Sequence, residues 1–119
     1  MSRKTATVHS LGDYHARQRT LYFTRAELNQ LLGLYSLHVM RGVWRDYAID
    51  HFPGLARFSV FRHTHEAPAY MVIKTAASAS QPSEFIVQTD RQRLRVSRNL
   101  SEALEYFRSH LRLVASGPA

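Results

Sequence analysis

The sequence contains no cysteine among its 119 residues. This absence excludes disulfide scaffolds, thiolate zinc sites and thiol nucleophiles, and it suits a reducing compartment. No apolar run approaches the roughly 18 residues that would cross a membrane, and the first twenty residues lack the continuous apolar stretch of a secretory signal. We therefore expect a soluble cytoplasmic protein of one domain, because this length leaves no room for a second core.

Acidic residues are also scarce. Nine Asp and Glu stand against 16 Lys and Arg, which gives a formal net charge of +7 and a pI near 10.4. Such an excess favours anionic partners, and we expect nucleic acid or an acidic protein surface rather than a membrane. A basic surface also serves solubility, so charge alone does not identify the partner.

Motifs of catalysis and of metal binding are missing as well. The chain has no nucleophile elbow and neither of the glycine-rich phosphate loops. Asp46 and Asp50 are flanked by arginines, which stabilise the charged carboxylates and suit them poorly for general-acid work. His63 and His65, with His51 beside Asp50, match no metal-ligand spacing. We therefore expect no enzyme, no cofactor and no metal site.

A strong helix signal covers residues 24–41. Thr24 can cap the helix N-terminus and Glu27 can return a hydrogen bond, as in a capping box. Gly42 is typical of the residue that follows a helix. Apolar positions at helical spacing predict one buried face, made of Leu28, Leu31, Leu32, Tyr35 and Val39.

The rest of the chain changes to a strand period and then returns to a helical one. Short alternating segments predict about five strands, at residues 44–50, 57–63, 70–74, 84–89 and 93–97. A second helix is expected from Asn99, with a buried face of Leu100, Leu104, Phe107 and Leu111. Short connections favour antiparallel neighbours.

The predicted architecture is α+β: an N-terminal helix, an antiparallel meander of about five short strands and a C-terminal helix. Both amphipathic helices are expected on one face of the sheet. We expect a flexible basic arm at residues 1–20, a single α+β domain at residues 21–114 and a frayed tail at residues 115–119.

The aromatic residues of the second and third strands allow two interpretations. Phe61 and Tyr70, near Arg62, would let bases of a single-stranded nucleic acid stack on the sheet if they face outward. However, Phe58, Val60 and Phe61 do not alternate cleanly, so either one aromatic residue is exposed or both faces of the sheet are covered. Core packing is favoured, because large aromatic residues are usually buried.

Several short motifs resemble one known family. They are Phe23-x-Arg25-x-Glu27-Leu28, Leu34-Tyr35, Gly42-x-Trp44-Arg45-Asp46-Tyr47-Ala48-Ile49-Asp50, Phe58-Ser59-Val60-Phe61-Arg62, and then Glu66, Pro68, Tyr70 and Lys74. The sequence resembles the alphaproteobacterial family catalogued as domain of unknown function 2794, over roughly residues 22 to 113. The resemblance is specific through residue 74, because the run from Trp44 to Asp50 is not a generic pattern.

The resemblance implies a small bacterial protein and carries no established activity, cofactor or catalytic residue. The chain departs from the family pattern at four positions. Ser36 and Val43 stand where the pattern has glycine and glutamate, and Met71 and Ile73 stand where it has arginine and glutamate. A site that used those polar positions in relatives would be altered here.

The segment before the last helix is rich in arginine. Its candidate anion-binding residues are Arg91, Arg93, Arg95 and Arg98. In a strand, alternate arginines project from one face while Leu94 and Val96 turn inward to the helices. One interpretation is a row that binds phosphates, because the guanidinium fork matches phosphate oxygens. The other, which is favoured, is the solvated outer face of an amphipathic strand.

The run from Trp44 to Asp50 is the densest polar and aromatic segment. One interpretation makes Trp44, Arg45 and Asp46, together with Arg62, a recognition surface, since tryptophan and arginine are typical interface anchors. The other is structural: Arg45 pairs with a carboxylate while Trp44 seals the sheet edge. Both interpretations stay open.

These observations predict a small non-enzymatic binding module, of a regulatory or adaptor kind, that contacts an anionic partner. Nucleic acid is slightly preferred to an acidic protein surface. The alternative is a protein-interaction or homodimerising module that uses the segment from Trp44 to Asp50. An enzyme for a small anionic substrate is the least favoured hypothesis.

Overall fold

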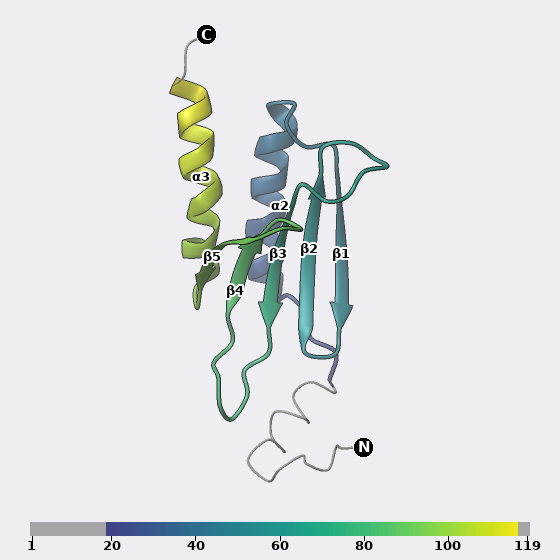
Figure 1. Ribbon diagram of the computed structural model, residues 1–119, viewed down its shortest axis with the longest axis vertical. Coiled ribbons are helices and arrows are strands. Elements are labelled where there is room, and N and C mark those ends of the chain that lie inside the picture. Colours follow the sequence, from purple (N-terminus) through teal and green to yellow (C-terminus); the bar gives the residue numbers. More distant parts are fainter. Residues whose placement is uncertain (1–18, 117–119) are drawn as a thin grey trace.

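The computed structural model describes residues 19–116 and confirms the α+β architecture. Its elements are α2 (Arg25–Met40), β1 (Asp46–Phe52), β2 (Leu55–Phe61), β3 (Tyr70–Thr75), β4 (Phe85–Gln88), β5 (Arg93–Ser97) and α3 (Leu100–Ser116). The strands form one antiparallel sheet in the order β1-β2-β3-β4-β5. Both helices pack on the same face of this sheet, so the predicted layer arrangement is confirmed (Figure 1).

The predicted arm and tail fall largely outside the described residues, which exclude 1–18 and 117–119. The first two described residues lie against the turn between β1 and β2. Thr20 forms an isolated β-bridge with Pro53, and the N–H of Gly54 donates to the carbonyl of Arg19 at 2.9 Å. At the other end, α3 continues to Ser116, two residues into the predicted tail.

Helix α2 begins and ends at the residues that the sequence indicates. The hydroxyl of Thr24 accepts from the N–H of Glu27 at 3.1 Å, and the Glu27 carboxylate accepts from the N–H of Thr24 at 2.8 Å, which confirms the capping box. Gly42 follows with φ of +74°, a conformation that favours glycine. The N–H groups of Gly42 and Val43 donate back to carbonyl oxygens of the last helical turn at 2.9 Å. This Schellman-type ending turns the chain toward β1.

The buried face of α2 is centred differently from the prediction. Leu31, Leu34 and His38 are buried, whereas Val39 is 40% exposed. At 100° per residue, His38 lies within about 20° of Leu31 around the helix axis, and Val39 lies about 80° away. The predicted stripe was therefore wrong at Val39, and it missed a buried histidine.

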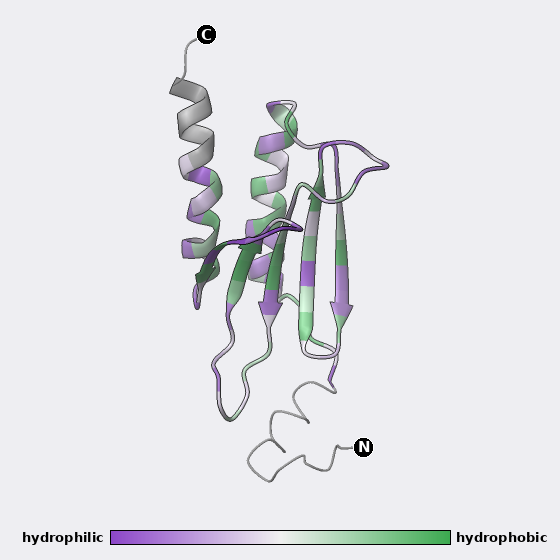
Figure 2. Ribbon diagram, in the orientation of Figure 1, coloured by the Kyte–Doolittle hydropathy of each residue, from purple (hydrophilic) through white to green (hydrophobic). Residues whose placement is uncertain are grey.

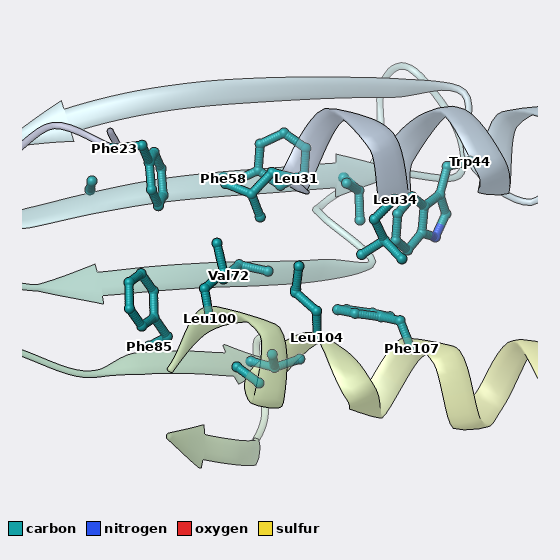
Figure 3. Packing of buried hydrophobic residues seen from close by; sticks show 14 residues of the cluster. Phe23, Leu31, Leu34, Trp44, Phe58, Val72, Phe85, Leu100, Leu104 and Phe107 are labelled. Atoms are coloured by element: carbon teal, nitrogen blue, oxygen red, sulfur yellow. The ribbon is translucent and has the colours of Figure 1, made fainter. Parts of the chain in front are cut away.

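The core lies between the helices and the helix-facing side of the sheet. Its buried members are Phe23, Leu31, Leu34, Trp44, Ala56, Phe58, Val60, Val72, Phe85, Val87, Leu100, Ala103, Leu104 and Phe107. Figure 3 shows Leu31 and Leu34 of α2, Leu104 and Phe107 of α3, and Trp44 converging over the strands. Because both helices and the strands β2, β3 and β4 share this one cluster, the described residues form a single packed unit.

A partly buried ion pair fixes the start of α2 to the sheet. The Lys74 ammonium on β3 lies 2.8 Å from the Glu27 carboxylate and also donates to the carbonyl of Tyr22 at 2.9 Å. The two side chains are only 12% and 18% exposed. Glu27 thus has two roles, since the carboxylate that completes the capping box also pairs with a strand residue far away in the sequence.

Candidate binding surfaces

The predicted arginine row lies on β5, where a β-bulge interrupts the alternation. Val87 pairs with Arg95 and Gln88 pairs with Arg93, so one extra residue of β5 has no direct partner across the ladder. Residues directly opposite each other share a face of the sheet. Arg93 therefore lies on the face away from the helices, and Arg95 lies on the helix-facing side. The bulge divides the row between two faces.

Arg95 is tied to the chain itself. Its guanidinium donates to the carbonyl of Glu102 in the first turn of α3 at 2.9 Å. The hydroxyl of Ser97 donates to the Glu102 carboxylate at 2.8 Å, so two β5 residues hold the start of α3. This arrangement favours the structural interpretation for Arg95.

The apolar residues of β5 also divide between the two faces. Leu94 packs against the core, as predicted. Val96 pairs with Ile86 on the face away from the helices and is 43% exposed. The expectation that Leu94 and Val96 both turn inward was wrong, because the bulge at Leu94 shifts the strand by one residue.

The other three arginines of the row are exposed. Arg91 lies in the β4–β5 turn, where its N–H donates to the Thr89 hydroxyl at 3.2 Å, and Arg98 lies between β5 and α3. Within residues 19–116, none of Arg91, Arg93 and Arg98 forms an ion pair. Figure 2 shows the β4–β5 connection as a hydrophilic stretch beside hydrophobic strands.

Trp44 does not belong to an exposed recognition surface. Its side chain is only 2% exposed, and its ring lies 4.0 Å from that of His38, 5.4 Å from Phe107 and 6.4 Å from Tyr70. The indole fills the space between α2, α3 and the sheet, which favours the structural interpretation of this residue. Its Nε1 is buried and has no hydrogen-bond partner in the described part of the chain.

The structure brings together the other three predicted recognition residues. The N–H of Arg45 donates to the carbonyl of Phe61 at 2.8 Å, Asp46 pairs with Phe61 across the ladder, and Arg62 follows directly. Arg45, Asp46 and Arg62 are all exposed at the end of the sheet where β1 begins. In an antiparallel meander, the β2–β3 and β4–β5 connections lie at this same end. Arg91, in the β4–β5 connection, therefore lies at the same end of the strands but toward the other edge of the sheet.

The sheet face away from the helices, called the open face below, carries neither helix. Among the described residues, the β3–β4 connection lies against one part of it, where Ile86 is only 5% exposed. Its residues are Asp46, Ala48, Asp50, Phe52, Leu55, Arg57, Ser59, Phe61, Met71, Ile73, Thr75, Ile86, Gln88, Arg93 and Val96. Phe61 faces this side, whereas Tyr70 faces the helices, where its ring centre lies 5.1 Å from that of Phe107. The irregular alternation around Phe58 and Phe61 was the sequence signal for an apolar outer face.

One ion pair lies on the open face between β1 and β2. The Arg57 guanidinium is 3.1 Å from the Asp50 carboxylate. The central carbon of this guanidinium, Cζ, lies 5.1 Å from the ring centre of Phe52. Both charged side chains of the pair are partly exposed. Asp50, which the sequence placed in a polar recognition segment, is thus held by a neighbouring strand.

Two hollows adjoin β5. The first, of about 380 Å³, lies between the β3–β4 connection and the open face, and its charged lining residues are Glu84 and Arg93. The second, of about 310 Å³, is lined by Arg95, Val96, Ser97, Glu102 and Glu105. Both mix charges of opposite sign, so neither is a purely cationic pocket.

The titratable groups with shifted pKa values lie around the core. Burial lowers the pKa of His38, although its Nδ1 donates to the Leu34 carbonyl at 3.0 Å. Burial also raises the pKa of Tyr35, with Asp46 adding to the effect, and raises that of Tyr106, with Tyr70 adding to it. None of the three shifted groups lines either hollow.

Residues 19–116 show neither a cluster of metal-binding side chains nor a helix that could cross a membrane. Among these, no group of three or more His, Asp or Glu side chains could hold a metal ion. His63 and His65 lie exposed in the β2–β3 connection. No described helix is both long and apolar enough to span a bilayer.

Comparison with known protein families identifies a matching family. The family model described as "Protein of unknown function (DUF2794)" matches residues 21–104, which is more than half of the chain. The matched region starts just before the α2 cap and ends within the first turns of α3. Searches of curated proteins and of solved structures give no match.

Proposed function

The chain belongs to the family of proteins of unknown function DUF2794, and from its surface we propose a non-enzymatic binding module, of a regulatory or adaptor kind, for an anionic partner. We propose nucleic acid as the partner. The observation that carries the proposal is a set of exposed arginines spread along the end of the sheet where β1 begins. Arg45 and Arg62 lie on the β1–β2 side, and Arg91 and Arg93 lie on the β4–β5 side.

Charge and chemistry both support a phosphate-bearing partner. The four arginines form no ion pair within residues 19–116, so they need not give up an internal partner when they bind an anion. The guanidinium group presents a planar fork that matches two phosphate oxygens. Asp46 and Asp90 lie at the same end, so the surface is mixed rather than uniformly basic.

The positions of the groups with shifted pKa values support a non-enzymatic role. Catalytic acids and bases are usually titratable groups with shifted pKa values in a cleft. Here Tyr35, His38 and Tyr106 pack against the core, away from both hollows. The hollows are lined by hydroxyls and oppositely charged residues, and the hydrogen bond there from the Ser97 hydroxyl to the Glu102 carboxylate is exposed and holds the start of α3.

The test is a fluorescence-anisotropy titration of the full chain with generic single-stranded and double-stranded DNA and RNA. Four phosphate contacts predict a slope of about −3.6 for log affinity against log salt, so raising salt from about 50 to about 200 mM should weaken binding by about 100-fold. The variants Arg45→Gln/Arg62→Gln and Arg91→Gln/Arg93→Gln should each remove about half of this slope.

Two single variants serve as controls. Arg98→Gln changes an exposed arginine at the opposite end of β5, and Arg108→Gln changes an arginine on α3 that pairs with Glu105 at 2.8 Å. Both should leave the salt slope nearly unchanged. The proposal fails if the wild-type chain binds none of the nucleic acids at low salt, or if the control variants weaken binding as much as the double variants do.

A further inference from the structure

The open face has the composition of a surface that is covered by protein. Antiparallel sheets with one solvated face usually present polar residues on that face. Here seven of the half-buried or exposed side chains are apolar: Ala48, Phe52, Leu55, Phe61, Met71, Ile73 and Val96. Adjoining apolar groups of this extent on a surface mark an interaction site.

The charges on this face are arranged around an apolar centre. The middle strand, β3, contributes Met71, Ile73 and the neutral Thr75. On one side Arg57 pairs with Asp50, and on the other side Arg93 and Glu84 line the same hollow. An apolar centre with a charged rim is the usual plan of a protein interface.

The balance of charge indicates which protein would fit. The chain as a whole carries +7, so two copies repel each other across most of their surfaces. On the open face Arg57 pairs with Asp50, Arg93 lines one hollow together with Glu84, and Asp46 lies at the end where β1 begins. The β1–β2 side of the face carries positive and negative side chains, and so does the β4–β5 side. A twofold axis at the apolar centre would therefore place positive and negative groups of one copy opposite positive and negative groups of the other.

We propose that the open face is a homodimer interface, with a second copy of this chain as its occupant. Met71 and Ile73 of the two copies would pack face to face, and the helices would lie on the two outer sides. A C2 contact uses the same patch on both subunits, which this self-complementary face allows. Nothing in this proposal depends on nucleic-acid binding.

The size of the face sets the expected strength of the dimer. Five strands at about 4.8 Å spacing and about 20 Å length give a footprint of about 400–500 Å² per copy. A standard stable interface buries about 800 Å² per partner. We therefore expect a weak, concentration-dependent dimer rather than a permanent one.

Sedimentation velocity of the full chain over a wide concentration range tests the proposal, with two matched pairs of variants. Met71→Glu places a charge at the centre of the open face, whereas Met40→Glu makes the same change on α2 at a residue that is 83% exposed. Val96→Glu and Val39→Glu form the second pair, because both valines are about equally exposed, at 43% and 40%, on opposite sides of the molecule. Circular dichroism and the fluorescence of the buried Trp44 report whether each variant is folded.

The wild-type chain, Met40→Glu and Val39→Glu should dimerise alike. Folded Met71→Glu and Val96→Glu should associate about tenfold more weakly or not at all, because an unpaired charge would be buried between the copies. If Met71→Glu fails to fold, Val96→Glu decides, since its side chain is already exposed. A wild-type chain that stays monomeric at every concentration overturns the proposal, and so does equal dimerisation of the open-face and control variants. A monomer would leave the open face to residues 1–18 or to another protein.

Discussion

The indole of Trp44 lies nearly parallel to the imidazole of His38, with ring centres 4.0 Å apart and planes inclined by 13°. Both side chains are buried, and the edge of Phe107 approaches both from α3. The imidazole is thus held between two helices, and protonation would place a charge where water cannot reach it. The chain therefore has a titratable group inside its core.

Stability should fall as the pH drops below the ordinary His pKa of 6.5. The folded chain keeps His38 neutral because burial lowers its pKa, whereas the unfolded chain takes up the proton near 6.5. The unfolded state then binds more protons, so acid favours it. Between about pH 7.5 and about pH 5.5, His38 should cost about 1 kcal/mol of unfolding free energy. Urea titrations at several pH values measure this change.

His38→Phe is the matched variant for that measurement, because an aromatic ring is kept against Trp44 while the titrating group is removed. The unfolding free energy of His38→Phe should depend less on pH in the same range, by the same amount of about 1 kcal/mol. Identical pH profiles for the two chains would contradict a buried neutral histidine.

Trp44→Ala should destabilise the fold by about 3–5 kcal/mol, the usual cost of truncating a buried aromatic residue. The indole contacts rings from both helices and from β3, so the cavity would open in the middle of the core. Thermal and urea unfolding followed by circular dichroism measure the loss. A cost below about 1 kcal/mol would show that the side chain is not packed as described.

Lys74→Met should cost about 2 kcal/mol, because it leaves the Glu27 carboxylate partly buried without its partner. Arg108→Met breaks an exposed pair of similar length, from Arg108 to Glu105 on α3, and should cost less than about 0.5 kcal/mol. Urea unfolding of both variants gives the comparison. Equal costs would mean that the α2–β3 pair is as solvated as the one on α3.

Replacing either of two glycines near α2 by alanine should change the stability of the fold, in opposite directions for the two positions. A Cβ at either position meets no atom within 4 Å, so packing is not the issue. Gly33 lies in the helix, where alanine should stabilise by about 0.5–1 kcal/mol. Gly42 has φ of +74°, so Gly42→Ala should destabilise by about 1 kcal/mol. Melting temperatures of the two variants should therefore move apart, and a shift in the same direction would contradict the positive φ.

The fold was predictable because local signals agree with it. The order of the elements follows from the Thr24–Glu27 capping box, from Gly42 and from the change between helical and strand periodicity of the apolar residues. Short connections then favour pairing between strands that are neighbours in the sequence. The predicted bounds of β1 and β2 are each two residues from those in the structure. Periodicity identifies an element more reliably than its ends, because the terminal residues have few ladder contacts.

The candidate site was less predictable, because it depends on contacts that are distant in sequence. Nothing in the run from Arg93 to Ser97 signals that β5 carries a bulge, yet that bulge sends Arg93 and Arg95 to different faces. Likewise, Trp44 precedes β1 in a polar segment that suggests exposure, and only its packing between α2 and α3 decides its burial. The open face was signalled only by the irregular alternation in β2.

The sequential strand order has a consequence for how the chain folds. Every ladder of the sheet joins segments that follow each other in the sequence, so each pairing step closes a short loop at a small entropic cost. Folding rates fall as the mean sequence separation of contacts rises. This sheet should therefore assemble hairpin by hairpin and quickly for a β-rich domain. The most distant step in sequence is the packing of α3 against α2, where Ser101 donates to Gln30 and the ring of Phe107 lies against that of His38.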